Sequence, residues 1–519
     1  GAQESDMTDG SGPSRSPSSP RSPSLLDALV PVITLILLIG STIALFGIDA
    51  TAGPLQVALL MSATVAGLVA FKNGYSSAYI RDAAIGGVAS GMAALFILLA
   101  VGALIGTWNM AGTIPTIVYY GIGLLNATWF YAATAIVCAL VGMAIGSSWT
   151  TAATVGVALV GMAPLLGASP VIAAGAVISG AYFGDKMTPL SETTILVPSL
   201  VGGVTTNQHI AAMIWTAGVA IVIAIGLFAI LGLAVPPAAV PMDPADAQAA
   251  VASQFSITPL NLLPLAVLVV LSIRQVPPFL AILSCALLGG LLALVTQPAT
   301  VAAFVDRPDA GPLATGLSAI FAAMATGFVS STGSVQIDAL FSGGGMDSML
   351  STVWLVLAAL SFGAIMEQAG FLERLIRPVI ARARTTGSLI AAVIFTSIGL
   401  NVVAGDQYVA DVLPSRVYRD EFAQRGLAPR MLSRAVEDAG TVTSPLVPWN
   451  TCGAYMSGVL GIATGEYFIY CFFNLLSPVI SLIYGFTGFR IEHIRPSAGT
   501  PGAAPGPAQR PIATEGGPV

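Results

Sequence analysis

The chain has 519 residues, of which 55% are hydrophobic and only 8% are charged, with a formal net charge of −6. Soluble globular domains carry about 25% charged residues, so this composition excludes a molecule covered by water and indicates an integral membrane protein embedded in a lipid bilayer. There is no basic stripe and no zinc or RNA-binding motif, so we expect no nucleic-acid partner.

The two ends of the chain differ from the rest. Residues 1–24 are rich in Ser, Pro and Gly and lack an apolar run, which argues against a signal peptide. We expect this segment and residues 495–519 to be disordered tails on the cytoplasmic side. The four cysteines show no metal-ligand spacing, and no cofactor is expected.

Apolar stretches divide the remaining chain into candidate spans, because a helix needs about 20 apolar residues to cross the hydrocarbon core. Uninterrupted candidates are 28–48, 54–71, 83–105, 210–235, 258–273, 277–296, 348–366 and 466–488. Four other stretches, 129–166, 170–201, 387–417 and 431–463, are broken near 146–151, 183–193, 403–407 and 440–451. Shorter helix-prone pieces lie at 113–125 and 371–384, the second amphipathic and interfacial.

The interrupted stretches form two ordered pairs. Gly146 precedes Pro189 by 43 positions, and Gly405 precedes Pro445 by 40. Three uninterrupted spans precede each pair and one follows it. We therefore predict a first repeat over 25–235, an extracytoplasmic linker over 236–257 and a second repeat over 258–494. Residues 313–332 have no counterpart in the first repeat and are expected to be an inserted partial helix.

Charge placement predicts the topology. If 129–166 and 387–417 are re-entrant hairpins, each repeat crosses five times, and the two repeats are inverted. A cytoplasmic N-terminus then places 17 of the 19 basic residues in the cytoplasm, as the positive-inside rule requires. The predicted fold is all-α, with two inverted repeats of five spanning helices, each with a re-entrant hairpin and a broken helix. It has about ten spans in the cell membrane, and both termini are cytoplasmic.

Ionisable residues concentrate in the helix breaks. Broken helices at corresponding positions of two repeats indicate a midplane site, where freed carbonyls and helix termini bind ions. A charge at this depth costs at least about 2.5–3.5 kcal/mol, so these residues must be paired, hydrated or bound to ions. We predict that Asp185, Glu192, Asp406, Glu437 and Asp438 bind cations and protons. Asp411 lies either in the site or near a helix end. An alternative is that the charges form internal pairs that only position helices.

Polar side chains gather at the same four breaks, and hard cations such as Na⁺ favour oxygen ligands of this kind. The candidates are Ser147, Ser148, Thr150, Thr151, Lys186, Ser191, Thr193, Thr194, Asn401, Gln407, Thr441, Ser444, Asn450 and Thr451. Any single Ser or Thr can instead cap a helix or bond back to a carbonyl. Because Lys186 follows Asp185, we expect Lys186 to supply a resident cation that Na⁺ displaces. His209 and His493 occupy predicted loop positions without an acidic partner in sequence and receive no role.

Three segments carry a resemblance to a known family: GDKMTPLSETT (184–194), AGDQYVADVLPSRVY (404–418) and LSRAVEDAGTVTSPLVPWNTCGAYMSGVLG (432–461). They resemble the signatures of the NhaC-type Na⁺/H⁺ antiporter family of the ion transporter superfamily. The resemblance implies inverted repeats with two re-entrant hairpins, a scaffold domain, a mobile transport domain and an elevator mechanism in a homodimer. It also implies Na⁺ and H⁺ as the transported ions. Glu192 and Ile195 depart from the family pattern, which reads closer to SDTTN, and this bears on cation preference.

Other functions remain open at this stage. A Na⁺- or H⁺-coupled exchanger of small organic anions, such as malate and lactate, or of amino acids fits the same fold, with Lys186 and Trp449 as candidate contacts. A channel would show uncoupled flux. An enzyme is disfavoured, because the sequence offers no metal cluster and no nucleophile paired with a His.

Overall fold

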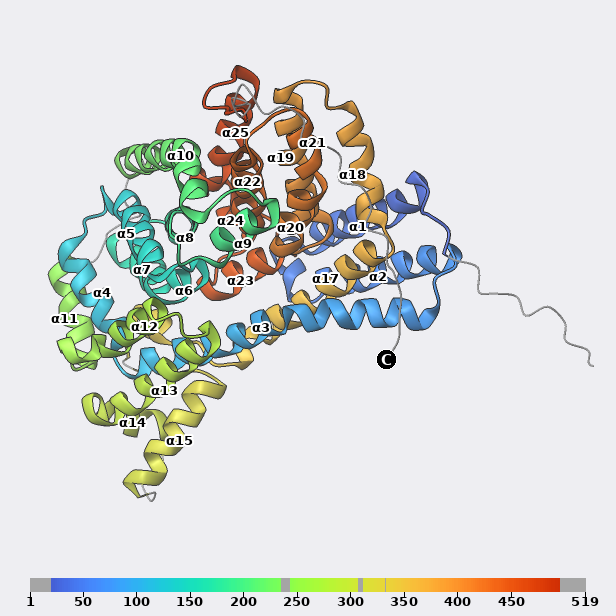
Figure 1. The fold of residues 1–519 in the computed structure, drawn as a ribbon. Helices are drawn as coiled ribbons and strands as arrows, with labels where there is room; N and C mark the ends of the chain where they lie inside the picture. Colours follow the sequence, from blue (N-terminus) through green and yellow to red (C-terminus); the bar gives the residue numbers. More distant parts are fainter. Residues whose placement is uncertain (1–19, 235–242, 307–310, 332, 495–519) are drawn as a thin grey trace, which may run out of the picture.

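Helices make up the computed structural model, which describes residues 20–234, 243–306, 311–331 and 333–494 (Figure 1). Within these ranges no β-strand element forms, which confirms the all-α prediction. The predicted tails lie largely, and the first part of the predicted linker wholly, outside the described residues.

The described residues 20–234 contain ten α-helices. They are α1 (Leu25–Phe46), α2 (Pro54–Lys72), α3 (Ser77–Met110), α4 (Thr113–Leu124), α5 (Phe130–Ile145), α6 (Ser148–Thr151), α7 (Val157–Met162), α8 (Pro170–Lys186), α9 (Glu192–Val201) and α10 (Thr206–Ala234). Helix α1 begins where Ser24 and Asp27 cap each other, each side chain accepting the backbone N–H of the other residue (3.1 and 3.0 Å).

The second half repeats the order of three helices, a short helix and two interrupted helices. Its members are α12 (Leu263–Ile273), α13 (Pro278–Thr296), α17 (Leu350–Gln368), α18 (Phe371–Arg382), α19 (Thr386–Val403), α20 (Gln407–Val417), α21 (Arg419–Gln424), α22 (Pro429–Val436), α23 (Thr451–Leu460), α24 (Thr464–Tyr467) and α25 (Phe472–Thr487). Between α13 and α17 lie α14 (Pro298–Val305), α15 (Pro312–Ala325) and α16 (Val335–Phe341). The predicted partial helix over 313–332 corresponds to α15.

Helices α1, α2, α3 and α17 lie together toward the lower right of Figure 1, and the interrupted helices α19, α20 and α22 lie above and to the left of them. Helix α3 packs against α13 and α17, and α2 packs against α1 and α17. Helix α5 packs against α8, and α25 packs against both α10 and α19. The interrupted helices of the two halves therefore share one packed unit.

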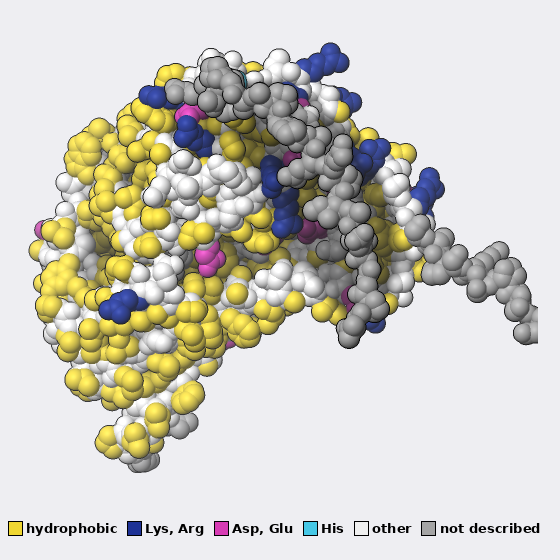
Figure 2. All heavy atoms as spheres, viewed as in Figure 1, with side chains coloured by type: hydrophobic (Ala, Val, Ile, Leu, Met, Phe, Trp, Pro, Cys, Tyr) yellow, Lys and Arg dark blue, Asp and Glu magenta, His cyan; other side chains and the backbone are white. Residues whose placement is uncertain are grey.

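Eight helical segments of the described chain are long and apolar enough to cross a membrane, or up to ten if each of two bent helix pairs counts as one span. Leu37 and Leu45 on α1 and Val222 and Leu233 on α10 are large apolar side chains that remain exposed. Figure 2 shows hydrophobic side chains over much of the visible face. Such a surface is stable in lipid, which confirms a multi-pass membrane protein.

Several details differ from the predicted spans. Ser148–Leu166 and Thr386–Val403, predicted to lie in non-crossing hairpins, have the length and composition of spans. The predicted single span 466–488 is two helical pieces bent by 56°. The predicted linker 236–257 contains a helix, α11 (Pro244–Gln254), whose N-cap Asp243 accepts from the N–H of Ala245 (3.0 Å). Periodicity alone does not reveal such bends.

Candidate functional site

The interrupted stretches that begin with α5 and α19 break in the same way. Helices α5 and α19 are followed by Gly146 and Gly405, whose φ angles are +77° and +66°, a conformation that glycine adopts without steric cost. The next residue then caps a new helix: Ser147 accepts from the N–H of Thr150, and Asp406 accepts from the N–H of Val409, both at 3.2 Å. The predicted breaks near 146–151 and 403–407 are confirmed.

A π-helical turn follows in each half, at Ala152–Gly156 and at Glu437–Thr441. In the first, the N–H of Val157 bonds to the carbonyl of Ala152, five residues back. Such turns often lie at functional sites. The second π-turn carries two acidic residues, Glu437 and Asp438, and both are fully buried.

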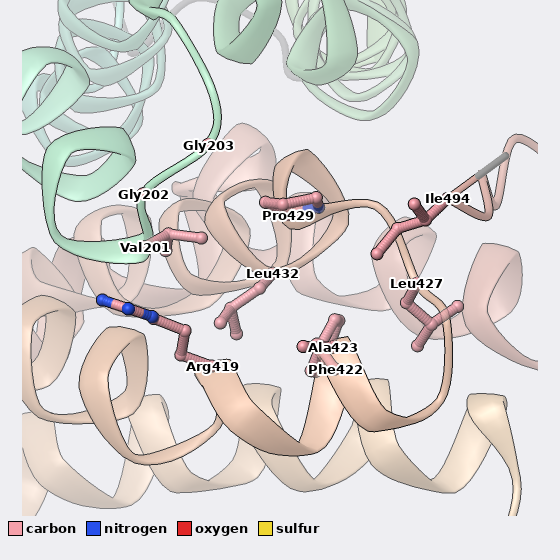
Figure 3. Close-up of a pocket in the computed structure, with 10 residues that line it drawn as sticks. All are labelled: Val201, Gly202, Gly203, Arg419, Phe422, Ala423, Leu427, Pro429, Leu432 and Ile494. Carbon is pink, nitrogen blue, oxygen red and sulfur yellow. The ribbon is translucent and has the colours of Figure 1, made fainter. Parts of the chain in front are cut away.

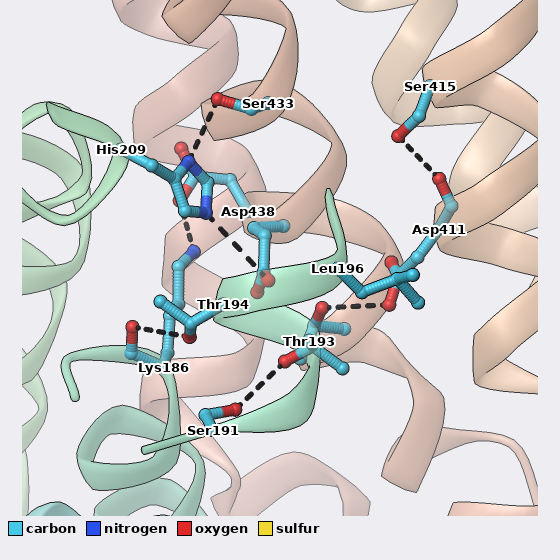
Figure 4. Close-up of polar contacts among 12 residues, drawn as sticks. Lys186, Ser191, Thr193, Thr194, Leu196, His209, Asp411, Ser415, Ser433 and Asp438 are labelled. Carbon is cyan, nitrogen blue, oxygen red and sulfur yellow. Dashed lines mark hydrogen bonds and ion pairs between the residues drawn. The ribbon is translucent and has the colours of Figure 1, made fainter. Parts of the chain in front are cut away.

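Lys186 and Asp438 form a buried ion pair that joins the two halves (Figure 4). Both side chains are fully buried, and the Asp438 Oδ1 also accepts from the Thr216 hydroxyl (3.0 Å) and the Ser477 hydroxyl (3.4 Å). Lys186 therefore pairs with Asp438 and not with its sequence neighbour Asp185, because α8 directs the ammonium toward the second π-turn.

Asp411 lies inside α20 and is fully buried, so it belongs to the same region rather than to a helix end. Its Oδ2 accepts from the Thr441 hydroxyl (3.0 Å) on the second π-turn. A Cβ added to Gly440 would lie 2.2 Å from the Asp411 Oδ1. Only glycine at 440 allows this close approach of carboxylate and backbone.

Several buried carboxylate oxygens here accept no hydrogen bond from the described part of the chain. They are Oε1 and Oε2 of Glu437, Oδ2 of Asp438 and Oδ1 of Asp411. An unsatisfied buried polar group is costly, and a buried charge costs more. These oxygens are therefore available to a proton or a cation.

The carboxylates of Asp185, near the C-terminal end of α8, and of Asp406 contact helix N-termini. The Asp185 Oδ2 accepts from both the N–H (2.9 Å) and the hydroxyl (2.7 Å) of Ser148, at the start of α6. Asp406 caps α20, and its Oδ2 accepts from the Thr451 hydroxyl (3.3 Å). Both half-helix N-termini, which favour negative charge, are thus occupied by carboxylates of the chain itself.

Hydrogen bonds from side chains link α19 and α20 to the second break. The Asn401 side chain donates to the carbonyl of Gly440 (2.6 Å), and the Asn450 side chain donates to the Asn401 Oδ1 (3.0 Å). The Ser444 hydroxyl donates to the Gln407 Oε1 (2.8 Å). These contacts fix the backbone around the second π-turn.

The remaining polar candidates make local contacts. Thr151 bonds back to the carbonyl of Ser147 (2.8 Å), and Thr150 contacts the Ser147 hydroxyl (3.1 Å). Thr194 donates to the carbonyl of Lys186 (3.1 Å). The hydroxyls of Ser191 and Thr193 lie 3.2 Å apart (Figure 4).

Glu192 is exposed in the first turn of α9, away from the buried acids. Helix α9 begins at this residue, and the negative charge of Glu192 stabilises the N-terminus of the helix.

The two halves also meet through aromatic rings. Trp149 on α6 stacks on Tyr455 of α23 with ring centroids 4.0 Å apart, and the Tyr455 hydroxyl donates to the carbonyl of Trp149 (3.0 Å). Helix α6 therefore packs against α23, the helix that follows the second break.

His209 is the residue that sequence reasoning missed. It lies in α10, fully buried, with Nδ1 2.8 Å from the Ser433 Oγ and Nε2 3.8 Å from the Glu437 Oε1. The predicted span began at residue 210, which left His209 in a loop. Thr216, seven residues later on the same helix face, also contacts the acidic group. Extending the helical periodicity one turn upstream would have revealed this face.

A cavity of about 210 Å³ lies elsewhere, between the Gly202–Gly203 turn and helices α21 and α22 (Figure 3). Arg419, Phe422 and Leu432 are among its lining residues, and none of the buried acids lines it. In the described ranges no three His, Cys, Asp or Glu side chains come together as a metal site.

Apolar spans combined with fully buried charges on interrupted helices define a membrane transporter. Residues 180–489 match the model of the Na⁺/H⁺ antiporter family. The chain is 35% identical to the Na⁺/H⁺ antiporter NhaC of Alkalihalophilus pseudofirmus, over 84% of this chain and 90% of the relative. The chain therefore belongs to the Na⁺/H⁺ antiporter family.

Relatives named for other transport activities are nearly as similar. The malate-2H⁺/Na⁺-lactate antiporter of Bacillus subtilis is 31% identical, over 84% of this chain and 90% of the relative. The arginine/ornithine antiporter ArcD of Halobacterium salinarum is 33% identical, over 90% of this chain and 93% of the relative. Family membership alone therefore leaves the substrate open.

Proposed function

We propose that this protein exchanges Na⁺ for H⁺ by alternating access. The observation that carries the proposal is the buried ion pair of Lys186 and Asp438, beside Glu437 and Asp411 with their unpartnered oxygens. A small hard cation needs oxygen ligands, and a buried carboxylate that can hold either a proton or a cation is an exchange device.

Competition between positive charges for the buried carboxylates explains how Na⁺ movement is coupled to H⁺ movement. Lys186 neutralises Asp438 when no other cation is bound, and Na⁺ at the adjacent carboxylates replaces protons held there. Because an uncompensated buried charge is costly, the site stays near electrical balance in both loaded states. A loaded site can then move or reorient, whereas an unbalanced site cannot.

The arrangement of helices supports an elevator movement. We assign α1, α2, α3, α13 and α17 to the scaffold, and the hairpins and interrupted helices to a transport unit, as two packed groups. The repeated order of elements supports inverted repeats. We further propose a homodimer in the cell membrane with both termini cytoplasmic. Cysteine accessibility at position 420 tests this topology, since labelling from outside would contradict it.

The deciding experiment uses proteoliposomes with a preset pH gradient. Addition of Na⁺ or Li⁺, but not K⁺, is expected to collapse the gradient in the wild type. The variants Asp411→Asn and Asp406→Asn are expected to lose this response. Wild-type vesicles that ignore Na⁺ and Li⁺ would contradict the proposal.

A second candidate is exchange of an organic solute, favoured by the malate/lactate and arginine/ornithine relatives. The acids at the two half-helix N-termini argue against an organic anion there, because Asp185 and Asp406 already fill those positions. A guanidinium or ammonium group would be compatible with the unpartnered oxygens. Malate, lactate, arginine and ornithine are added to the same vesicles, and a gradient that only one of them collapses would establish this alternative.

A further inference from the structure

His209 lies between Ser433 and Glu437, which belong to one helical segment next to α10. Its ring reaches from α10 toward Ser433 (Figure 4), with Nδ1 2.8 Å from the Ser433 Oγ. Its Nε2 faces the Glu437 Oε1 at 3.8 Å, and both side chains are fully buried.

The hydroxyl of Ser433 can accept a hydrogen bond from the ring. Its oxygen lies 3.2 Å from the carbonyl of Arg430, and when the hydroxyl donates its single proton there, the oxygen accepts from His209. In that arrangement Nδ1 carries a hydrogen, and in the neutral ring Nε2 presents a lone pair. This lone pair points toward a carboxylate.

Two acceptors thus face each other in a buried place. Nε2 of His209 and both carboxylate oxygens of Glu437 have no hydrogen-bond partner in the described part of the chain. Leaving such groups unsatisfied costs about 1–3 kcal/mol each, and more when they are charged. At 3.8 Å the two atoms form no hydrogen bond, but one proton held by either residue leaves the pair without net charge, which removes the cost of a buried carboxylate.

The other charges around α10 are already engaged or remote. Charged side chains on the elements that pack against α10 are Asp185 and Lys186 on α8, Glu192 on α9, Arg430 and Arg434 on α22, and Glu437 and Asp438 on the second π-turn. The uncharged titratable side chains on these elements are Tyr131 and Cys138 on α5, Tyr182 on α8 and Tyr484 on α25.

Of these charges, Lys186 is paired with Asp438, and Arg434 donates to the carbonyl of Arg490 (3.1 Å). Glu437 is therefore the carboxylate that faces His209.

We propose that His209 carries an exchangeable proton of the transport cycle, shared between its Nε2 and Glu437 and displaced when a cation binds Glu437. This inference rests on the proposed Na⁺/H⁺ exchange and names a proton site within it. One positive charge arrives as Na⁺, and one leaves as H⁺ from Nε2 to water, so the charge of the group is unchanged.

The test counts protons released when Na⁺ binds the purified full-length protein. Calorimetry in buffers of different ionisation enthalpy gives this number directly. His209→Gln is expected to release fewer protons per Na⁺, by up to about one. His493→Gln, which changes the second histidine of the sequence at an exposed position, is expected to match the wild type. Wild-type proton release by His209→Gln overturns the proposal.

A second measurement covers the case in which His209→Gln fails to fold. In the His493→Gln background, nitrogen NMR of the remaining histidine reports which ring nitrogens carry hydrogen. We expect hydrogen on Nδ1, and loss of the Nε2 hydrogen when Na⁺ replaces K⁺ at constant pH. Ring protonation unchanged by Na⁺ rejects the role of His209. Wild-type protein that binds no Na⁺ instead refutes the antiport itself.

Discussion

Lys186 and Asp438 lie 252 positions apart and form an ion pair from which the surrounding protein excludes solvent. Lys186 ends α8 in the first half, and Asp438 lies in the π-turn of the second. Neither half alone neutralises its own charge, so correct packing of the halves against each other is a condition for burying both.

Removing one partner of this ion pair is expected to lower the stability of the protein more than removing both partners. Lys186→Met leaves Asp438 buried without compensation, which costs about 3–5 kcal/mol. The double variant Lys186→Met/Asp438→Asn is expected to recover most of that loss, although it should not transport. Unfolding of the detergent-solubilised protein gives the comparison. Arg377→Met, which breaks an exposed pair with Glu373, serves as control and should cost about 1 kcal/mol or less.

Gly440→Ala should displace Asp411. The new Cβ would lie 2.2 Å from the carboxylate oxygen, and overpacking of this kind costs about 1–3 kcal/mol. We expect weaker Na⁺-driven proton flux together with lower stability. Gly399→Ala, where a Cβ meets nothing within 4 Å, should be neutral or stabilising. Equal behaviour of the two variants would show that Asp411 tolerates displacement.

Asp406 combines a capping role with a charge, and two substitutions separate them. Asparagine is as good an N-cap as aspartate, whereas alanine loses about 1 kcal/mol. Asp406→Asn should therefore keep the stability of the wild type, and Asp406→Ala should not. If Asp406→Asn folds normally and retains full exchange, the charge at this position is not used in transport.

Na⁺ itself should stabilise the protein. A ligand that binds only the folded state adds about 2.7 kcal/mol at one hundred times its Kd. The Tm is expected to be higher in NaCl than in KCl at the same ionic strength. Asp411→Asn should abolish this difference. An equal Tm for the wild type in both salts would argue against a Na⁺ site.

Local sequence is sufficient to predict the breaks at Gly146 and Gly405, because a glycine followed by Ser147 or Asp406 ends one helix and caps the next. Long-range partners are different. The contact of His209 with Glu437 depends on how α10 packs against the second π-turn, and no spacing in the chain encodes that distance. The exposure of Glu192 likewise follows from which face of α9 points outward.

The second π-turn places one additional residue in its helix, and this has a consequence for genetics. Deleting one of the uncharged residues 439–441 would restore regular α-helical winding, in which each residue turns by about 100°. The acids before the deletion would then rotate away from Lys186 relative to everything that follows. Such a deletion predicts a less stable chain that no longer exchanges ions, a loss-of-function allele created without changing any charged residue.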